Sequence, residues 1–99
     1  QDIDCPFGDD EEISIAKIAI PSGASTGWHK HHYPVFAYVL KGTLTVEIER
    51  GKFIKYPENT SFSEVIETYH NGTNKEDDYL VLIAFYLGKK GEPLSISRE

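Results

Sequence analysis

Residues 27–42 have the sequence GWHKHHYPVFAYVLKG, in which a histidine-rich segment is followed at once by an apolar run. The apolar part, residues 35–40, is rich in β-branched and aromatic side chains, which favour strands. Pro34 and Gly42 enclose this run, which is too short for a helix. The stretch therefore predicts a strand that carries histidines, a turn, and a second strand paired beside the first.

Three of the four histidines of the chain lie in this stretch, at His29, His31 and His32. Side chains two residues apart on a strand point to the same face, so the imidazoles of His29 and His31 can converge on one point. His32 then points to the opposite face and is expected on the surface. His70 lies far along the chain and can join the cluster only through the fold. A histidine-rich surface turn is the alternative to a metal site while no third ligand is identified.

Composition sets the class of protein and limits its partners. The chain has 99 residues, enough for one domain with one core. Its 39% hydrophobic and 26% charged residues are typical of a globular chain rather than a disordered one. No apolar run approaches the roughly 20 residues that span a bilayer. The net charge of −6 argues against nucleic acid or an anionic membrane as a partner.

The rest of the chain is predicted to consist of short strands separated by turns. Residues 43–49 alternate between polar and apolar, the pattern of a strand with one buried face. Residues 79–87 are almost entirely apolar, as expected of a strand buried on both faces. Turn signals recur about every eight to twelve residues, and no segment has helical periodicity. We therefore predict an all-β sandwich or barrel with strands at residues 12–20, 29–31, 35–40, 43–49, 53–56, 61–66, 79–87 and 94–97.

Two groups of residues match a known pattern. The first group consists of Gly23, His29, His31 and residues 38–44 (YVLKGTL), and the second of residues 59–64 (NTSFSE) and 70–74 (HNGTN). Together they resemble the two conserved motifs of the cupins, specifically of small single-domain cupins. His70 and Asn74 fall where the second motif carries its histidine and its asparagine.

The resemblance implies an all-β fold of the double-stranded β-helix type, a jelly-roll barrel in a single domain. The barrel is expected over residues 13–87, with an N-terminal arm at residues 1–12 and a C-terminal tail at residues 88–99. Cys5, in the arm, is the single cysteine, so no intrachain disulfide is expected. Gln1 in place of Met is consistent with a removed signal peptide, other trimming or a chain boundary. Localisation, cytoplasmic or periplasmic in a bacterium, therefore stays open.

The resemblance also implies a divalent transition metal inside the barrel, bound by His29, His31 and His70. The glutamate usual in the first motif would fall at Val35, or at Phe36 in the variant with one more residue, and neither side chain can ligate. Imidazole suits iron, zinc, nickel and copper, so the ligands alone do not choose among iron, zinc and nickel, the metals we expect. Without the carboxylate, harder ions such as manganese are disfavoured and coordination positions stay open for water or substrate.

Other residues are candidates for supporting roles. Glu64 is predicted to hydrogen-bond a ligating histidine or a bound water, and a fourth metal ligand or a solvent-facing carboxylate are the alternatives. Trp28, Tyr38 and Phe62 are candidates for substrate binding, and packing in the core or at an interface is the alternative for each. Asn74 is expected to brace the turn after the preceding strand through its side-chain amide.

Two classes of function remain open. Three-histidine cupins include iron dioxygenases, so one hypothesis is a metal-dependent enzyme, dioxygenase-like, an isomerase or a hydrolase, that acts on a small molecule. The alternative is a non-catalytic barrel that binds a metal ion or a small ligand. No catalytic residue can be named, because Glu64 and the tyrosines are the only candidates for proton transfer. We also expect a homodimer, since small barrels leave edge strands that can pair with a second copy.

Overall fold

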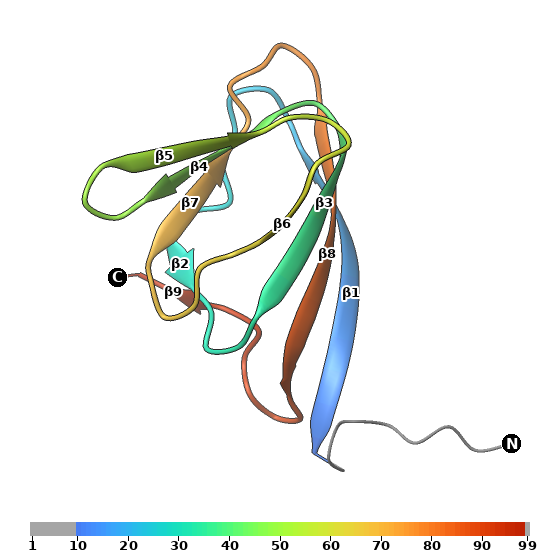
Figure 1. The fold of residues 1–99 in the computed structure, drawn as a ribbon, viewed down its shortest axis with the longest axis vertical. Coiled ribbons are helices and arrows are strands. Elements are labelled where there is room, and N and C mark those ends of the chain that lie inside the picture. The colour runs from blue at the N-terminus through green and yellow to red at the C-terminus, as the bar shows by residue number, and fades with distance from the viewer. Residues whose placement is uncertain (1–9, 99) are drawn as a thin grey trace, which may run out of the picture.

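The computed structural model describes residues 10–98, which fold into two antiparallel β-sheets (Figure 1). The first sheet has the strand order β1-β8-β3-β6, and the second has the order β5-β4-β7-β2-β9. The first sheet contains β1 (Glu11–Ile20), β8 (Leu80–Lys89), β3 (Val35–Lys41) and β6 (Ser61–Ser63). The second contains β5 (Lys52–Tyr56), β4 (Leu44–Ile48), β7 (His70–Thr73), β2 (His29–Lys30) and β9 (Ile96–Ser97). No helix occurs between residues 10 and 98, which confirms the all-β prediction.

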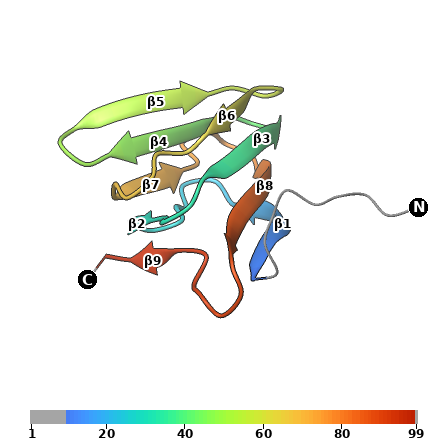
Figure 2. The ribbon, with the colours of Figure 1, turned by 60° about the horizontal axis from the view of Figure 1, so that its bottom comes forward.

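The chain crosses repeatedly between the two sheets, which face each other as the two walls of a barrel (Figure 2). Strands β3, β6 and β8 belong to the first sheet, while the strands between them in sequence belong to the second. This winding is that of the predicted double-stranded β-helix. Alternate residues of the long strands point inward and form the core, which contains Ile20, Val35, Ala37, Val39, Leu44, Val46, Ile48, Leu80, Leu82 and Ala84.

Two tight turns connect the strands at positions that the sequence marks with glycine. Gly42, between β3 and β4, has a φ of +86°, and an added Cβ there would lie 3.2 Å from the carbonyl oxygen of Tyr79. Glycine is therefore required at this position for both its conformation and its size. Arg50 and Gly51, between β4 and β5, both have positive φ values (77° and 82°), as in a type I′ hairpin turn.

Several elements differ from the sequence-based expectation. Strand β6 ends at Ser63, so the predicted strand over residues 61–66 is too long. The histidine strand β2 is only two residues long, and His31 lies beyond its end. Strand β8 is not buried on both faces: Phe85 is 38% exposed. The reason is that β8 lies in the middle of the first sheet, with one face toward the second sheet and one toward solvent. Of the expected arm, residues 1–9 with Cys5 lie outside the described residues.

Asn74 holds the loop after β7, as the sequence analysis expected. Its side chain is fully buried and donates hydrogen bonds from Nδ2 to the carbonyl oxygens of Ile20 (2.8 Å) and Asp78 (2.7 Å). Its Oδ1 accepts a hydrogen bond from the backbone N–H of Glu76 at 3.0 Å. One side chain therefore joins the end of β1 to the loop that leads into β8.

Replacing Asn74 by Ala should lower the free energy of unfolding by about 2–4 kcal/mol, because two backbone carbonyls lose their donor. Urea unfolding measures the loss. Asn71→Ala is a matched control, since Asn71 Oδ1 has no hydrogen-bond partner among the described residues. The control should cost less than about 1 kcal/mol. Equal losses in the two variants would show that Asn74 is not a brace.

Candidate metal centre

Three histidines meet between the two sheets. His29 on β2 and His70 at the start of β7 lie directly opposite each other in register. His31 follows two residues after His29. The ring centroids of the three imidazoles are 4.4–5.3 Å apart. His31 and His70 are almost completely buried, with 2% and 1% of their surface exposed. The fold thus brings together the three histidines that were expected to share a metal.

Each of these rings is held by a hydrogen bond from Nδ1 to a backbone carbonyl. The acceptors are Gly27 for His29 (2.7 Å), Leu94 for His31 (2.8 Å) and Thr68 for His70 (2.9 Å). A carbonyl oxygen only accepts hydrogen bonds, so Nδ1 carries a proton in all three rings. In a neutral ring Nε2 then keeps its lone pair. Bonds of this kind orient the ligating histidines of metal sites.

Glu64 adds a carboxylate to the cluster. Its backbone N–H donates to the carbonyl oxygen of Val35 at 2.8 Å, so Glu64 lies across from the position at which the motif glutamate was expected. Residues opposite each other on antiparallel strands have side chains on the same face, so the carboxylate enters the barrel. Its Oε2 lies 3.0 Å from His31 Nε2 and 3.6 Å from His70 Nε2. Glu64 is therefore placed among the histidines, not behind them or in solvent.

The four side chains fit a divalent metal. One ligand atom from each of His29, His31, Glu64 and His70 lies within 4.8 Å of the others. The buried Nε2 atoms of His31 and His70 have no hydrogen-bond partner among the described residues, despite the nearby carboxylate. A buried polar atom without a hydrogen-bond partner destabilises the folded state, so these two atoms require a partner such as a metal ion. Three imidazole nitrogens and one carboxylate oxygen are donors that divalent transition metals accept.

The cluster perturbs the pKa values of its own members. Burial alone would raise the pKa of Glu64, but the adjacent His31 and His70 imidazoles more than offset it and lower that pKa to about 2. Burial acts to lower the pKa of His70, but the Glu64 carboxylate raises it above its ordinary value. Burial lowers the pKa of His29, and the neighbouring imidazoles add to this effect. His29 is therefore favoured in the neutral form that can ligate a metal.

Two hollows adjoin the cluster. A cavity of about 40 Å³ between the sheets reaches His29 and Glu64. A cleft of about 240 Å³ reaches His29 and His31. Ile18 and Tyr86 line both hollows, so a small molecule in the cleft would lie beside the cluster. Apart from the histidines, the polar side chains of the cleft are mainly hydroxyls, from Thr26, Tyr86, Ser95 and Ser97.

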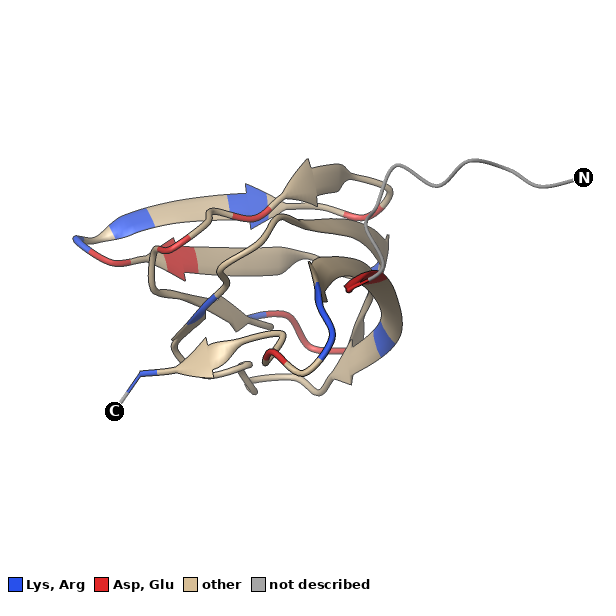
Figure 3. Cartoon of the chain, turned by 90° about the horizontal axis from the view of Figure 1, so that it is seen from below, with Lys and Arg blue, Asp and Glu red and all other residues tan. Residues whose placement is uncertain are grey.

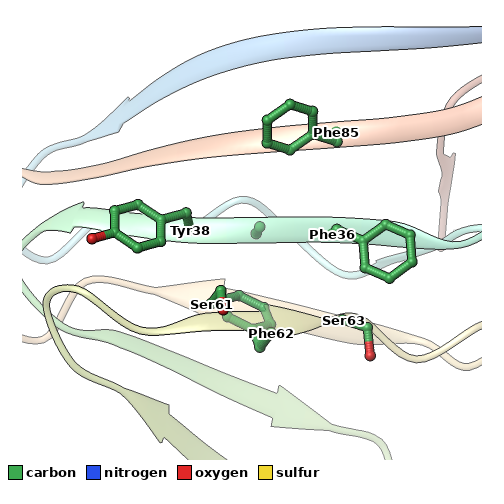
Figure 4. A pocket seen from close by; sticks show the side chains of 7 residues that line it. Phe36, Tyr38, Ser61, Phe62, Ser63 and Phe85 are labelled. Carbon is green, nitrogen blue, oxygen red and sulfur yellow. The ribbon is translucent and has the colours of Figure 1, made fainter.

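The aromatic residues predicted to bind substrate lie in different places. Trp28 lines the cleft. Tyr38 lies on the outer face of the first sheet (Figure 4). Its hydroxyl donates to Asn59 Oδ1 at 2.9 Å. Phe62 packs against the core and stacks on Tyr56, with ring centroids 3.8 Å apart. The structure therefore places neither Tyr38 nor Phe62 at the cleft, since their strand positions direct them elsewhere.

Tyr86 is a site residue that the sequence analysis did not single out. Its ring centroid lies 5.8 Å from that of His31, and it lines both hollows. Burial raises its pKa, and the charge of Glu64 adds to the shift. The signal was available in the alternation of β8, because Tyr86 is two residues beyond Ala84, which points inward. An interpretation of the apolar run as buried on both faces conceals this alternation.

Fold and site together define a double-stranded β-helix barrel with a candidate metal centre in its interior. The chain belongs to the cupin domain family, whose sequence profile matches residues 16–86. No curated protein sequence shows significant similarity to the chain.

Solved structures share the fold at low sequence identity. An RmlC-like cupin with a double-stranded β-helix fold from Methanocaldococcus jannaschii is 19% identical, with a TM-score of 0.70 over 80% of this chain and 72% of that one. The DMSP lyase DddQ from Ruegeria pomeroyi is 12% identical, with a TM-score of 0.72 over 91% of this chain. A candidate sugar phosphate isomerase from Acidithiobacillus ferrooxidans is 25% identical, with a TM-score of 0.62 over 74%. The matches cover only 44% of the lyase and 48% of the isomerase.

The pKa shifts predict how stability of the metal-free protein depends on pH. The Glu64 pKa is lower in the folded chain than its ordinary value of 4.5, so its contribution is present above pH 4.5 and is lost as pH falls toward about 2. The His70 pKa is raised above 6.5, so its contribution is present below that pH and is lost as pH rises through the raised value. The pair should therefore stabilise the fold most between about pH 4.5 and 6.5.

Thermal unfolding in excess chelator, at pH 3.5, 5.5 and 8, measures this dependence. Glu64→Gln should be destabilised relative to the unsubstituted protein chiefly at pH 5.5, because the neutral amide cannot pair with a charged imidazole. The pKa of His29 is lowered chiefly by burial, which destabilises both proteins as pH falls below 6.5. Identical pH profiles for the two proteins would contradict the Glu64–His70 pairing.

Proposed function

We propose that this protein binds a divalent transition metal ion through His29, His31, Glu64 and His70, and that the metal binds a small molecule in the adjacent cleft. One observation carries the proposal. All three imidazole rings have Nδ1 tied to a backbone carbonyl, and the Nε2 atoms of His31 and His70 lie 3.0 and 3.6 Å from the Glu64 carboxylate. One ligand atom from each of the four side chains lies within 4.8 Å of the others. With Nδ1 protonated, the buried Nε2 atoms of neutral His31 and His70 are acceptors that face the Glu64 carboxylate, itself an acceptor, and a metal ion bound between them would satisfy both.

The donor set indicates which metals are suitable. Imidazole nitrogens suit iron, zinc and nickel, the metals expected from the sequence. A site of three histidines alone would disfavour manganese, but Glu64 restores a negative charge and an oxygen donor. We therefore extend the expected set to include manganese. Three neutral imidazoles and one carboxylate leave a divalent ion with one positive charge in excess, which favours an anionic or chelating oxygen ligand.

The cleft limits the class of ligand. Its volume of about 240 Å³ accommodates a small molecule only, since pockets for drug-sized ligands are typically larger than about 300 Å³. Its described lining residues include neither Lys, Arg, Asp nor Glu. Lys and Arg are instead spread over several segments and interleaved with Asp and Glu (Figure 3). The ligand that fits is a small oxygen-bearing molecule that hydrogen-bonds hydroxyl groups and carries little charge beyond that met by the metal.

We favour a catalytic role on the basis of Tyr86. A metal bound here would polarise a carbonyl or hydroxyl oxygen of the ligand, which is the chemistry a Lewis acid supplies. Tyr86 lines the same cleft, and its hydroxyl is the group we assign to hydrogen-bond the ligand. The similar fold of a lyase and of a candidate sugar phosphate isomerase supports an enzyme of the lyase or isomerase type. Iron would additionally permit the dioxygenase-like chemistry considered above.

A non-catalytic metal- or ligand-binding protein is the second candidate. It is favoured by the scarcity of proton-transfer groups, since Tyr86 is the one ionisable residue of the described cleft lining that is not in the histidine cluster. Tyr86→Phe separates the two. Each protein is loaded with metal and incubated with small hydroxy acids, keto acids and sugars, and products are detected by mass spectrometry. Conversion that the variant loses, with metal content unchanged, indicates an enzyme. Ligand-induced thermal shifts without conversion in either protein indicate a binding protein.

Metal analysis of protein purified without an affinity tag tests the site itself. The protein should contain close to one equivalent of metal, and His31→Ala should lower the affinity at least about tenfold because one ligand is lost. His32→Ala is the matched control, since its ring is on the surface and pairs with Glu67 at 2.8 Å. Metal affinity should also fall below about pH 6, where free imidazole takes up a proton. Equal losses for His31→Ala and His32→Ala would show that the metal is not bound in the barrel.

A further inference from the structure

We infer that the C-terminal segment, residues 94–98, is part of the metal centre: it positions His31 and forms one wall of the cleft. This inference rests on the proposed metal function. The segment lies beyond residues 16–86, which match the cupin profile, and it was expected to be a tail. In the structure the chain turns after β8, with the N–H of Glu92 donating to the carbonyl of Lys89 at 3.1 Å. It then returns to the second sheet as β9, the neighbour of β2.

The three histidines differ in how their rings are held. His29 and His70 donate to carbonyls only two residues earlier in the chain, just before their strands begin, so local backbone conformation orients them. His31 instead donates to Leu94, which is 63 residues away in sequence. Its anchor is therefore supplied by the C-terminal segment, not by its own strand. Without this acceptor, the Nδ1–H of a ring that is only 2% exposed would lose its partner.

The same segment contributes side chains to the cleft. Ser97 pairs with His29 in the β2–β9 ladder, and Ser95 and Ser97 both line the cleft. Arg98 closes the ladder through a hydrogen bond from its N–H to the carbonyl of Trp28 at 3.0 Å. Its guanidinium lies 4.2 Å from the centre of the Trp28 ring. The segment thus contributes two serines to the lining of the cleft and contacts Trp28, which also lines it.

The C-terminal segment is attached without being part of the core. Only Ile96 is partly buried, while residues 94, 95, 97 and 98 are exposed. The core residues lie on β1, β3, β4 and β8. Removal of the segment should therefore leave the barrel folded, because the buried apolar contacts are made elsewhere. What it should change is the orientation of His31, and loss of such a supporting hydrogen bond typically weakens metal binding about 10–100-fold.

A chain that ends at residue 93 tests this inference against the full chain. Zinc affinity, measured by chelator competition, should fall about 10–100-fold. NMR of the zinc-loaded proteins should show the Nδ1–H signals of all three histidines in the full chain. The His31 signal alone should be lost on truncation, a change that general destabilisation would not produce. Lys90→Ala is a control that should keep both the affinity and the signal, because Lys90 is exposed in the turn before the segment and does not line the cleft.

The outcomes are distinguishable. A truncated chain that binds zinc as tightly as the full chain overturns the role of the segment and leaves the proposed metal site standing. A full chain that binds no zinc, manganese, iron or nickel overturns the proposed function itself. If the truncated chain is unfolded by circular dichroism, the Ile96→Ala, Arg98→Ala double variant replaces it. Weaker binding with loss of the His31 signal supports the inference, and an unchanged signal overturns it.

A separate observation concerns the outer face of the first sheet, where apolar side chains project from neighbouring strands. The cross-strand register aligns Ile15 of β1, Phe85 of β8 and Phe36 of β3 in one row. Tyr38 and Ile83 lie opposite each other in the next row along β3 and β8. Figure 4 shows Phe36, Tyr38 and Phe85 on these adjacent strands, where they line a shallow groove of about 330 Å³. The outer face is the surface formed by Ile13, Ile15, Phe36, Tyr38, Ile83 and Phe85.

The outer face is unusually apolar for a sheet surface in contact with water. Ile15 is 66% exposed, Ile13 and Phe36 are each 47% exposed, and Phe85 is 38% exposed. The solvent side of an antiparallel sheet normally carries polar residues. A contiguous apolar patch of this kind marks an interaction site.

We propose that a second copy of this chain covers the outer face. The four strands have lengths of 10, 10, 7 and 3 residues. At about 3.4 Å per residue and about 4.8 Å between strands, the sheet surface amounts to roughly 500 Å². Two copies packed face to face would thus bury about 1,000 Å², the lower bound of a specific interface. The same flat apolar surface on both copies is what a two-fold axis requires. The contact would use the face of the sheet rather than the edges first expected.

Light scattering at about 20 μM tests this interface, and the expected mass is twice the 11.2 kDa of one chain. Ile15→Lys and Phe85→Lys should each give a folded monomer, because a buried unpaired charge is costly at an interface. Phe53→Lys is the control, since Phe53 is 53% exposed on the second sheet, and it should remain dimeric. A monomeric unsubstituted protein, or a dimer that persists in both outer-face variants, would overturn the proposal.

Discussion

The candidate site depends on one constraint: each of three imidazole rings must give its Nδ1–H to a backbone carbonyl. His31 and His70 are almost completely buried, so an unpaired N–H there would be costly. With Nδ1 engaged, the Nε2 atoms of His31 and His70 face Glu64 in the interior, and the carbonyls fix the orientation of the three rings. The backbone therefore determines the direction of the ligand atoms. Two of the acceptors are local, and the third depends on how the chain end folds back.

The origin of the carboxylate illustrates how strand pairing can replace a motif residue. Val35 occupies the position at which the first cupin motif would place its glutamate, and its side chain is buried in the core. Glu64 is hydrogen-bonded to the backbone of Val35 from the neighbouring chain segment. Because opposite residues on paired strands share a face, the carboxylate reaches the same interior from a different part of the sequence. In this barrel the interior carboxylate is therefore supplied by a different segment of the chain from the one that carries the glutamate of the first cupin motif.

Stability and chemistry are assigned to different parts of the barrel. The cluster of fully packed apolar residues includes Ile20, Val39, Leu44 and Leu80, at the ends of the long strands and the start of β4. The histidines lie on the two-residue strand β2, just after it, and on β7. Short strands bury little apolar surface, which leaves a cleft open beside the metal ligands. The apolar core on the long strands stabilises the fold without filling the space beside the histidines, so the cleft there stays open.

The amino-acid sequence by itself determined the all-β class and the turns, because these depend on periodicity and short-range chemistry. The brace at Asn74 and the set of three histidines followed from the resemblance of the sequence to the two cupin motifs. It could not determine how far β8 is buried, because an apolar run does not show which face of a sheet is covered. Nor could it place Glu64 among the ligands or assign the C-terminal residues to the site. Glu64 meets His31 and His70 only when β6 pairs with β3, and Leu94 reaches His31 only across 63 residues of chain. Contacts between residues so far apart are made by strand pairing and barrel closure, which only the tertiary structure decides.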